Sequence, residues 1–246
     1  MMISPATPSD STARLGIVAA YRWEVAPLLR QQRRITRVGR QEYLMKLRGT
    51  DAALIVSGAG AENARRAAEH LISSYALRGL LSLGFAGGLK EGIAVGDLIV
   101  AEEVIEEIGG EEAGARRYPC QPETFPAPGS QRGILVTVQA VVAQASQKAA
   151  LRARWGALAA DMEAAGVARA AQAAGLPFAA LKAITDGPDT SLAIDFQNCQ
   201  REDGRLSSSK ILLAGMRGFA EFRTLWMLAK NSRLAARNLA RALGSE

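Results

Sequence analysis

The stretch LGIVAAYRWEVAPLLR, residues Leu15–Arg30, decides the fold class. Its first part, Leu15–Ala20, is a short apolar run that predicts a buried strand. Its second part, Glu24–Arg30, spaces apolar residues as one face of a helix does. A buried strand followed directly by a helix is the opening of an α/β fold.

The same alternation continues along the chain. Because strands that alternate with helices favour a parallel sheet covered on both faces, we expect one α/β domain with ligands at the carboxyl ends of its strands. The expected strands are Tyr43–Arg48, Ala52–Ser57, Gly79–Leu83, Leu98–Ala101, Ile134–Val138 and Phe178–Ile184, and the expected helices are Ala61–Tyr75, Val142–Arg154, Ala164–Ala174 and Ile211–Leu243.

The polar and flexible segments predict the boundaries of this domain. Residues 1–13 carry Pro, Ser and Thr without an apolar run and are expected to be disordered. Residues 14–200 are expected to form the domain, and 201–246 a basic helical extension packed on or beside it. Gly109–Gly129, rich in Gly, Pro and charge, is expected to be a long functional or mobile loop.

Composition narrows the class of protein. Of 246 residues, 48% are hydrophobic and 22% charged, which predicts a globular chain with a sizeable core. No apolar run is long enough for a membrane span, and no secretory signal is recognisable, so a cytoplasmic location is expected.

The counts of histidine and cysteine exclude much enzyme chemistry. His70 is the single histidine, which leaves little room for a Ser-His-Asp triad or a multi-histidine metal site. Cys120 and Cys199 are far apart and form no zinc motif, so no metal is expected. Any acid or base is therefore expected to be a carboxylate.

The positive charge is concentrated at the C-terminus. The net charge is +6, and residues 201–246 hold nine basic and four acidic residues. On a helix, Lys230, Arg233, Arg237 and Arg241 form one stripe, near Trp226. A solvated helix face explains the stripe, and so does contact with anionic lipid. Nucleic acid is disfavoured as a partner because no recognition motif accompanies the charge.

Three carboxylates follow predicted strands. Glu24, Glu163 and Asp186 each have an ordinary structural explanation, as first-turn helix acids or a turn initiator. Because strand ends meet at one edge of a parallel sheet, these acids are also expected to converge. Cleavage of an N-glycosidic bond suits such a group, since one carboxyl protonates the leaving base and another activates water.

A glycine motif, Gly58-Ala59-Gly60, also follows a strand and opens a helix. A dinucleotide-binding site is one interpretation, but the third glycine is replaced by Asn63 and no acid lies about 20 residues further on. A nucleotide-dependent oxidoreductase is therefore a disfavoured alternative. The helix start retains backbone amides that suit an anion.

Five motifs in order along residues 15–190 resemble the nucleoside phosphorylase superfamily, which includes the methylthioadenosine/S-adenosylhomocysteine nucleosidases. The resemblance implies an α/β/α sandwich with a mixed, mainly parallel sheet, no cofactor and a homo-oligomer, such as a homodimer. The motifs are Gly16–Ala20 with Glu24-Val25, Ser57–Gly60, Gly84–Leu89 with Val95–Asp97, Asp161–Ala165, and Pro177-Phe178 leading to Ile184–Asp186.

The resemblance also implies roles. Glu24 would activate water, Asp186 would donate a proton to the leaving purine, and Met162 and Glu163 would contact the ribose. The segment Phe85, Ala86 and Gly87 would lie beside base and sugar, and Ser57 and Gly58 belong to the same implied substrate site. The implied substrate is an adenine nucleoside with a 5′-substituent.

The nucleophile is left open. Ser82 stands where hexameric phosphorylases carry an arginine for phosphate, which favours water, whereas Arg22 offers a replacement phosphate contact. Phosphate thus stays a candidate co-substrate. The segment Val138–Val142 lacks the aromatic ring of standard nucleosidases.

Lys148–Asp189 and the basic tail most resemble the hopanoid-associated phosphorylase branch, whose inferred substrate is adenosylhopane. A lipid-linked nucleoside would make peripheral contact with the inner membrane face useful. A methylthioadenosine/S-adenosylhomocysteine nucleosidase is the first alternative, and a nucleoside-binding module without turnover is the second.

Overall fold

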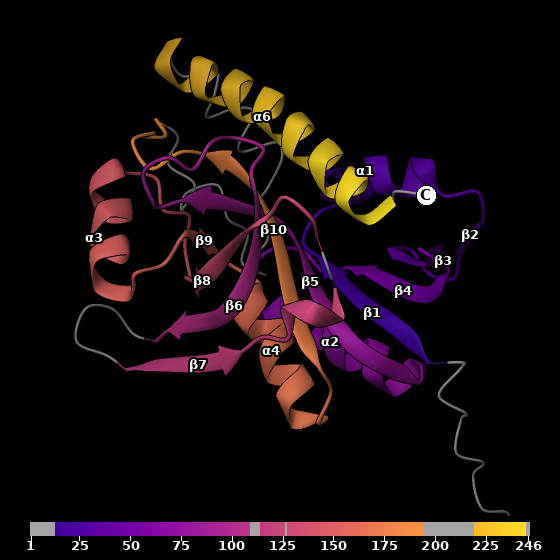
Figure 1. Cartoon of the computed structure of the whole chain (residues 1–246). Helices are drawn as coiled ribbons and strands as arrows, with labels where there is room; N and C mark the ends of the chain where they lie inside the picture. Colours follow the sequence, from indigo (N-terminus) through magenta and orange to yellow (C-terminus); the bar gives the residue numbers. More distant parts are fainter. Residues whose placement is uncertain (1–12, 109–113, 126, 194–218, 245–246) are drawn as a thin grey trace, which may run out of the picture.

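The computed structural model describes residues 13–108, 114–125, 127–193 and 219–244 (Figure 1). Its strands are β1 Arg14–Ala19, β2 Ile35–Arg37, β3 Glu42–Leu47, β4 Thr50–Val56, β5 Leu77–Gly88, β6 Leu98–Glu107, β7 Ala115–Pro119, β8 Gln131–Thr137, β9 Ala159–Asp161 and β10 Phe178–Asp186. Its helices are α1 Arg22–Gln31, α2 Ala61–Ser74, α3 Ala145–Trp155, α4 Ala164–Ala173 and α6 Phe219–Gly244, with a short 3-10 turn at Pro122–Thr124.

One mixed sheet of ten strands forms the centre, in the order β10-β6-β8-β9-β5-β1-β4-β3-β2, with β7 on the edge of β6. The pairs β4–β1, β1–β5, β5–β10, β6–β8 and β8–β9 are parallel. β10 pairs with both β5 and β6, and β9 pairs with both β5 and β8. These strands therefore close into a ring, whose rim carries the carboxyl ends of β5 and β10.

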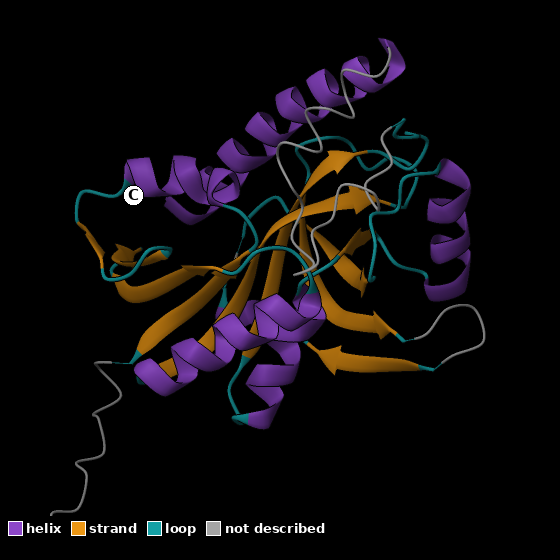
Figure 2. Ribbon diagram, turned by 180° about the vertical axis from the view of Figure 1, so that it is seen from behind, coloured by secondary structure: helices purple, strands orange, loops and turns teal. Residues whose placement is uncertain are grey.

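Helices cover the two faces of the sheet, as the front and back views show (Figures 1 and 2). One hydrophobic cluster joins the sheet to α2 and α4 through residues such as Leu71 and Val167. A second joins the other face to α1 and α6 through residues such as Leu28 and Leu239. The three-layer α/β/α sandwich with a mixed sheet is thus confirmed.

The contact between α2 and α4 depends on one glycine. A Cβ built on Gly166 would lie 1.8 Å from the carbonyl oxygen of Ala61, at the start of α2. No heavy atom can occupy that position, so the close approach of the two helices requires glycine. This approach places the start of α2 beside the residues that precede α4.

Two expectations from the sequence are wrong in this region. The segment Gly109–Gly129 is not a loop without regular structure, because β7 and the turn Pro122–Thr124 lie within it and β7 pairs antiparallel with β6. The strand expected at Gly79–Leu83 is also too short, because Gly84–Gly88 continues β5, whose pairing with β10 and β9 satisfies the backbone there.

The ends of the chain are described only in part. Residues 1–12 and 194–218 lie outside the described residues, so the expected disorder of 1–13 and the boundary near 200 stay predictions. The C-terminal helix α6 is long, and it packs against α1 and β10. In the described part of the chain, no helix is both long and apolar enough to span a bilayer.

Candidate active site

A pocket of about 150 Å³ lies where the carboxyl ends of β1, β5 and β10 meet the start of α1 and the segment before α4. It contains all three predicted carboxylates, Glu24, Glu163 and Asp186. The structure thus brings the three acids together from separate parts of the chain. The other lining residues are Ala20, Tyr21, Ala59, Phe85, Ala86, Gly87, Leu89, Val138, Ala140, Val141, Val142, Lys148, Ala160, Asp161, Met162 and Thr185.

Glu24 lies in the first turn of α1, directly after β1. Its Oε2 accepts hydrogen bonds from the backbone amides of Ala20 and Tyr21, both at 3.0 Å, which fixes the carboxyl toward the pocket. Burial raises the pKa of Glu24 to about 8, and the nearby charge of Glu163 adds to the increase. Near neutral pH, Glu24 therefore exchanges a proton readily, as a general base must.

Glu163 is held by backbone amides from two segments. Gly60 at the start of α2 donates to Oε1 at 3.0 Å, and Met162 donates to Oε2 at 3.3 Å. Burial raises the pKa of Glu163, while the ammonium group of Lys182 opposes the increase. The Gly60 amide at this helix start is therefore occupied by a carboxylate of the protein itself.

A buried ion pair lies beneath the pocket. Lys182 Nζ contacts Asp161 Oδ2 at 2.8 Å, and both side chains are almost completely buried. Asp161 also accepts hydrogen bonds from the Thr137 hydroxyl and from the amide of Ala164, the first residue of α4. Burial favours the neutral amine of Lys182, but the carboxylates of Asp161 and Glu163 outweigh it and raise its pKa. This cation offsets part of the negative charge in the pocket.

Asp186 ends β10 and is bound through both oxygens. Oδ1 accepts a hydrogen bond from the Thr185 hydroxyl at 2.9 Å, and Oδ2 contacts Lys148 Nζ at 2.5 Å. Lys148 comes from α3, which is distant in sequence. A carboxyl with two fixed partners has a defined direction in the pocket.

Two glycines of β5 leave room for the carboxyl groups. A Cβ on Gly84 would lie 3.1 Å from Glu24 Oε2, and a Cβ on Gly87 would lie 3.2 Å from Asp186 Oδ2. The glycine cluster that the sequence singles out therefore allows backbone to pass close to the two acids.

The remaining wall of the pocket is apolar. Phe85, Met162 and the segment Val138–Val142 supply most of it, together with alanines from β5 and β9. A flat, largely apolar ring beside a group of carboxylates is the kind of ligand that such a wall accommodates.

Three residues predicted for the site lie outside the pocket lining. Ser57 is buried, and its hydroxyl donates to backbone carbonyls of Ala19 and Gly58. Arg22, the predicted phosphate contact, is exposed at the first position of α1. In the described residues, the structure brings neither of them, nor Gly58, into contact with the pocket.

Sequence reasoning assigned no role to Lys148 or Tyr21, which also line the pocket. Lys148 carries no local signal, since it lies among polar residues on a helix. Only the tertiary structure, in which Lys148 Nζ contacts the Asp186 carboxylate at the end of β10, brings the two residues together.

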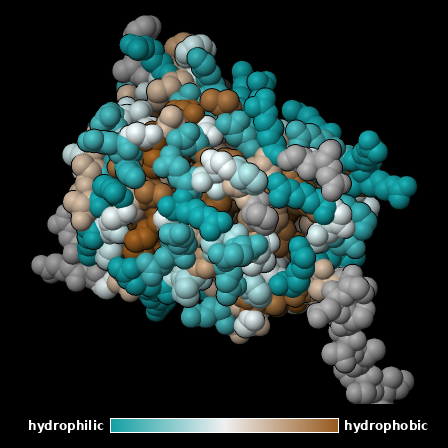
Figure 3. All heavy atoms as spheres, in the orientation of Figure 1, coloured by the Kyte–Doolittle hydropathy of each residue, from teal (hydrophilic) through white to brown (hydrophobic). Residues whose placement is uncertain are grey.

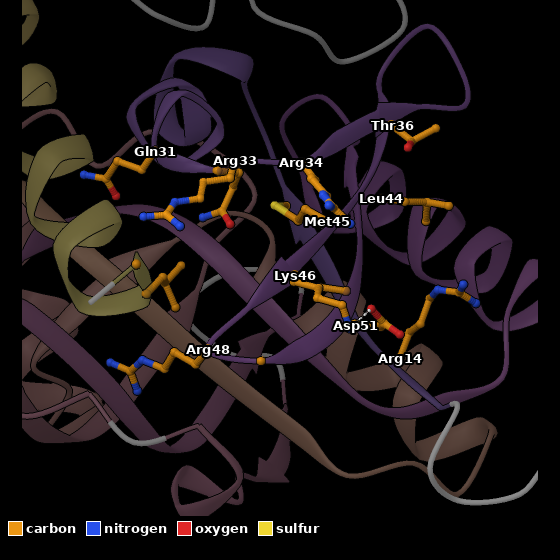
Figure 4. Close-up of a pocket in the computed structure, with 15 residues that line it drawn as sticks. Arg14, Gln31, Arg33, Arg34, Thr36, Leu44, Met45, Lys46, Arg48 and Asp51 are labelled. Atoms are coloured by element: carbon orange, nitrogen blue, oxygen red, sulfur yellow. Dashed lines mark ion pairs between the residues drawn. The ribbon is translucent and has the colours of Figure 1, made fainter. Parts of the chain in front are cut away.

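A larger groove of about 730 Å³ lies elsewhere, between α1, the strands β2–β4 and the end of α6 (Figure 4). Arg14, Arg33, Arg34, Lys46 and Arg48 line it, and its one carboxylate, Asp51, is paired with Lys46 at 2.9 Å. It lacks a second acid, so the smaller pocket is the candidate active site. Among the described residues, no group of histidine, cysteine or carboxylate side chains is arranged to hold a metal ion.

Comparison with known proteins identifies the family of this chain. The family model described as "Phosphorylase superfamily" matches residues 14–214. The chain belongs to the phosphorylase superfamily. A 5′-methylthioadenosine/S-adenosylhomocysteine nucleosidase of Oceanobacillus iheyensis is 26% identical over 206 residues, which cover 74% of this chain and 90% of that protein.

Solved structures of a nucleosidase and of a futalosine hydrolase share the fold. The nucleosidase of Neisseria meningitidis, in complex with methylthio-immucillin-A, aligns with a TM-score of 0.65 at 21% identity, covering 94% of this chain and 99% of the other. The futalosine hydrolase of Helicobacter pylori aligns with a TM-score of 0.66 at 18% identity, covering 94% and 97%. The family resemblance found in the sequence is thus confirmed.

Proposed function

We propose that this protein hydrolyses the N-glycosidic bond of an adenine nucleoside and releases adenine. The observation that carries the proposal is the pocket in which Glu24, Glu163 and Asp186 meet beside an apolar wall. Membership in the phosphorylase superfamily and the nucleosidase relative support it.

Each carboxylate has a place in this reaction. Glu24 accepts a proton from the attacking water, and Glu163 binds the hydroxyl groups of the ribose. Asp186 delivers a proton to the purine as the bond breaks. Met162, Phe85, Ala86 and Gly87 hold the sugar and base through apolar contacts and backbone.

Water is the proposed nucleophile instead of phosphate. Among the described residues that line the pocket, none is an arginine, and the one lysine, Lys148, is already bound to Asp186. In the described part of the chain, a phosphate dianion would therefore meet three acidic side chains and no cationic side chain free to bind it, which is unfavourable at close range. Neither Arg22 nor Ser57 faces the pocket to change this balance.

Adenine release tests the proposal directly. We expect release from 5′-methylthioadenosine, S-adenosylhomocysteine or an adenosine with a long 5′-alkyl group, at equal rates with and without phosphate. Asp186→Asn should lower kcat by at least ~100-fold, because it removes a proton donor that acts in the transition state. Asp189→Asn, at an exposed position nearby, is the matched control. Substrate binding without any adenine release would favour a non-catalytic binding module, and a strict phosphate requirement would favour phosphorolysis.

We also propose that the substrate is lipid-linked, as adenosylhopane is, and that α6 contacts the membrane. Phe222 and Trp226 are 58% and 64% exposed, and Lys230, Arg233 and Arg237 continue the same side of the helix at three- and four-residue steps. The Lys230 ammonium lies 5.8 Å from the centre of the Trp226 ring. Hydrophilic side chains predominate on the face seen in Figure 3, with apolar patches between them.

Aromatic and cationic side chains on one exposed helix face suit an anionic bilayer surface. Sedimentation with vesicles that contain phosphatidylglycerol tests the contact, and the double variant Phe222→Ser/Trp226→Ser should stay in the supernatant. Equal sedimentation of wild type and variant would refute the membrane contact.

Light scattering tests the predicted homodimer. A dimer that the double variant disrupts would assign this face of α6 to a second copy of the chain.

A further inference from the structure

Helix α3 buries a charged side chain against the rest of the protein. Among its residues, Ala145–Trp155, the only buried side chain is that of Lys148, which is 0% exposed. Surface helices normally bury apolar side chains, because burial of a cation requires compensation for its lost hydration. The burial of a lysine here calls for a specific partner.

The partners of Lys148 account for all three of its protons. Nζ contacts Asp186 Oδ2 at 2.5 Å, the carbonyl oxygen of Gly187 at 2.7 Å and that of Thr190 at 3.0 Å. An ammonium group has three donors, whereas the neutral amine has two. The resting site therefore contains the cation, paired with the Asp186 carboxylate.

This pairing raises a question for the proposed function. A carboxylate that is bound to an ammonium group carries no proton of its own, yet the departing purine requires one. The proton must reach Asp186 from a neighbour, and Lys148 is the one cationic side chain in contact with it among the described residues. Thr185, its other side-chain partner, is a hydroxyl and a much weaker acid.

Building on the proposed function, we propose that Lys148 is the positioning residue that loads Asp186 with the proton for the leaving base. As the bond from the sugar to the base breaks, its electron pair stays on the base. The Lys148 Nζ–H bond breaks while an Asp186 Oδ2–H bond forms, and this O–H bond breaks in turn while a base N–H bond forms, which leaves Lys148 neutral and Asp186 again a carboxylate. The neutral amine keeps two N–H groups for the carbonyls of Gly187 and Thr190.

The protons balance over one turnover. Water adds its hydroxyl to the sugar and gives its proton to Glu24, while Lys148 loses one proton to the base. After product release, Glu24 returns a proton to solvent and Lys148 takes one up. No oxidant or metal is required.

A purely structural role is the alternative, in which Lys148 only ties α3 to the body. The two roles differ for a substrate whose leaving group needs no proton. 4-Nitrophenyl β-D-ribofuranoside is such a probe, because 4-nitrophenolate is stable as an anion. 5′-Methylthioadenosine is the substrate that needs the proton.

The test compares Lys148→Met and Lys148→Gln with wild type on both substrates. We expect kcat on 5′-methylthioadenosine to fall by ~100-fold or more, within the range for loss of a general acid, with KM changed less than about threefold. Hydrolysis of the nitrophenyl riboside should stay within about fivefold of wild type. Lys148→Gln keeps N–H donors for the carbonyl oxygens of Gly187 and Thr190. It therefore replaces Lys148→Met in the test if that variant fails to fold.

Arg154→Met is the matched control. Arg154 lies on the same helix and ties it to Glu107 at 3.2 Å, away from the pocket. Its loss should leave both activities near wild type. A second control adds Lys148→Met to Asp186→Asn, which should cause no further loss because the two residues act in one step.

Several outcomes would overturn the proposal. Equal losses on both substrates would show a structural role, and unchanged activity on 5′-methylthioadenosine would show that the proton comes from elsewhere. If wild type releases adenine but no nitrophenol, the proposal is tested by the double variant Lys148→Met/Asp186→Asn on 5′-methylthioadenosine. A loss of kcat equal to the combined losses of the two single variants would refute the proposal. Wild type that releases no adenine from any of the three nucleosides would refute the proposed function itself.

Discussion

Glu24 makes a prediction about stability as well as catalysis. The pKa of its buried carboxyl is about 8, against 4.5 for the ordinary side chain. Between these values the folded protein holds a proton that the unfolded chain has released. Because the folded state then binds more protons, its free energy of unfolding falls as pH rises through this window.

The size of the effect follows from the shift. Each pH unit inside the window costs about 1.4 kcal/mol, so ionisation of Glu24 lowers stability by about 4 kcal/mol between pH 5 and pH 9. Glu24→Gln removes the titration. Its amide oxygen can still accept the hydrogen bonds that Ala20 and Tyr21 donate to Glu24. We therefore expect the variant to match wild type near pH 5 and to be more stable by a few kcal/mol at pH 9.

Urea unfolding at one-unit steps from pH 5 to pH 9, followed by tryptophan fluorescence, measures this difference. Glu91→Gln, at an exposed position, is the control and should follow wild type throughout. The difference between Glu24→Gln and wild type isolates Glu24, because the other titrating groups are present in both proteins. A difference that stays constant with pH would refute the raised pKa and with it the assignment of Glu24 as the base.

Three further predictions follow from the site. Because Glu24 must be ionised to accept a proton from water, kcat/KM for adenine release should rise with pH up to about 8, and a profile flat from pH 5 to 9 would contradict that role. Gly87→Ala puts a methyl group 3.2 Å from Asp186 Oδ2, so kcat should fall by roughly 10- to 100-fold through displacement of that carboxyl. The control is Gly114→Ala, at an exposed position with open space around it, which should leave kcat near wild type. Asn231→Ala removes the donor to the Thr185 carbonyl and should lower the free energy of unfolding by about 1–3 kcal/mol in a urea titration, whereas no change would show that water replaces the bond.

The sequence predicts the fold and the three acids well for a physical reason. Apolar runs such as Leu15–Ala20 report burial directly, and the carboxyl ends of strands must share an edge, so Glu24 and Asp186 meet by topology. β7 was missed because a short edge strand needs only one partner and carries little apolar pattern: within it, only Tyr118 is buried.

The cations of the site could not be predicted in the same way. Lys182 lies inside an apolar strand and Lys148 on a polar helix, so neither has a sequence pattern that shows its partner. Their partners, Asp161 and Asp186, are set by tertiary packing. For Arg22 the sequence predicted a contact that the structure does not form. Arg22 is close to Glu24 in sequence, but the two side chains leave the first turn of α1 on different sides, so Arg22 is exposed and Glu24 is buried.

The packing of α6 has a practical consequence for anyone who prepares this protein. Asn231 of α6 donates to the Thr185 carbonyl at 2.8 Å, one residue before Asp186, and the helix also buries Leu239 and Leu243 against the sheet. A sample clipped by a protease ahead of this helix would keep every lining residue of the pocket and still expose core surface. Weak turnover in such a sample would result from loss of the support that α6 gives to the pocket, and not from a poor substrate. The intact mass should therefore be checked before any substrate is dismissed.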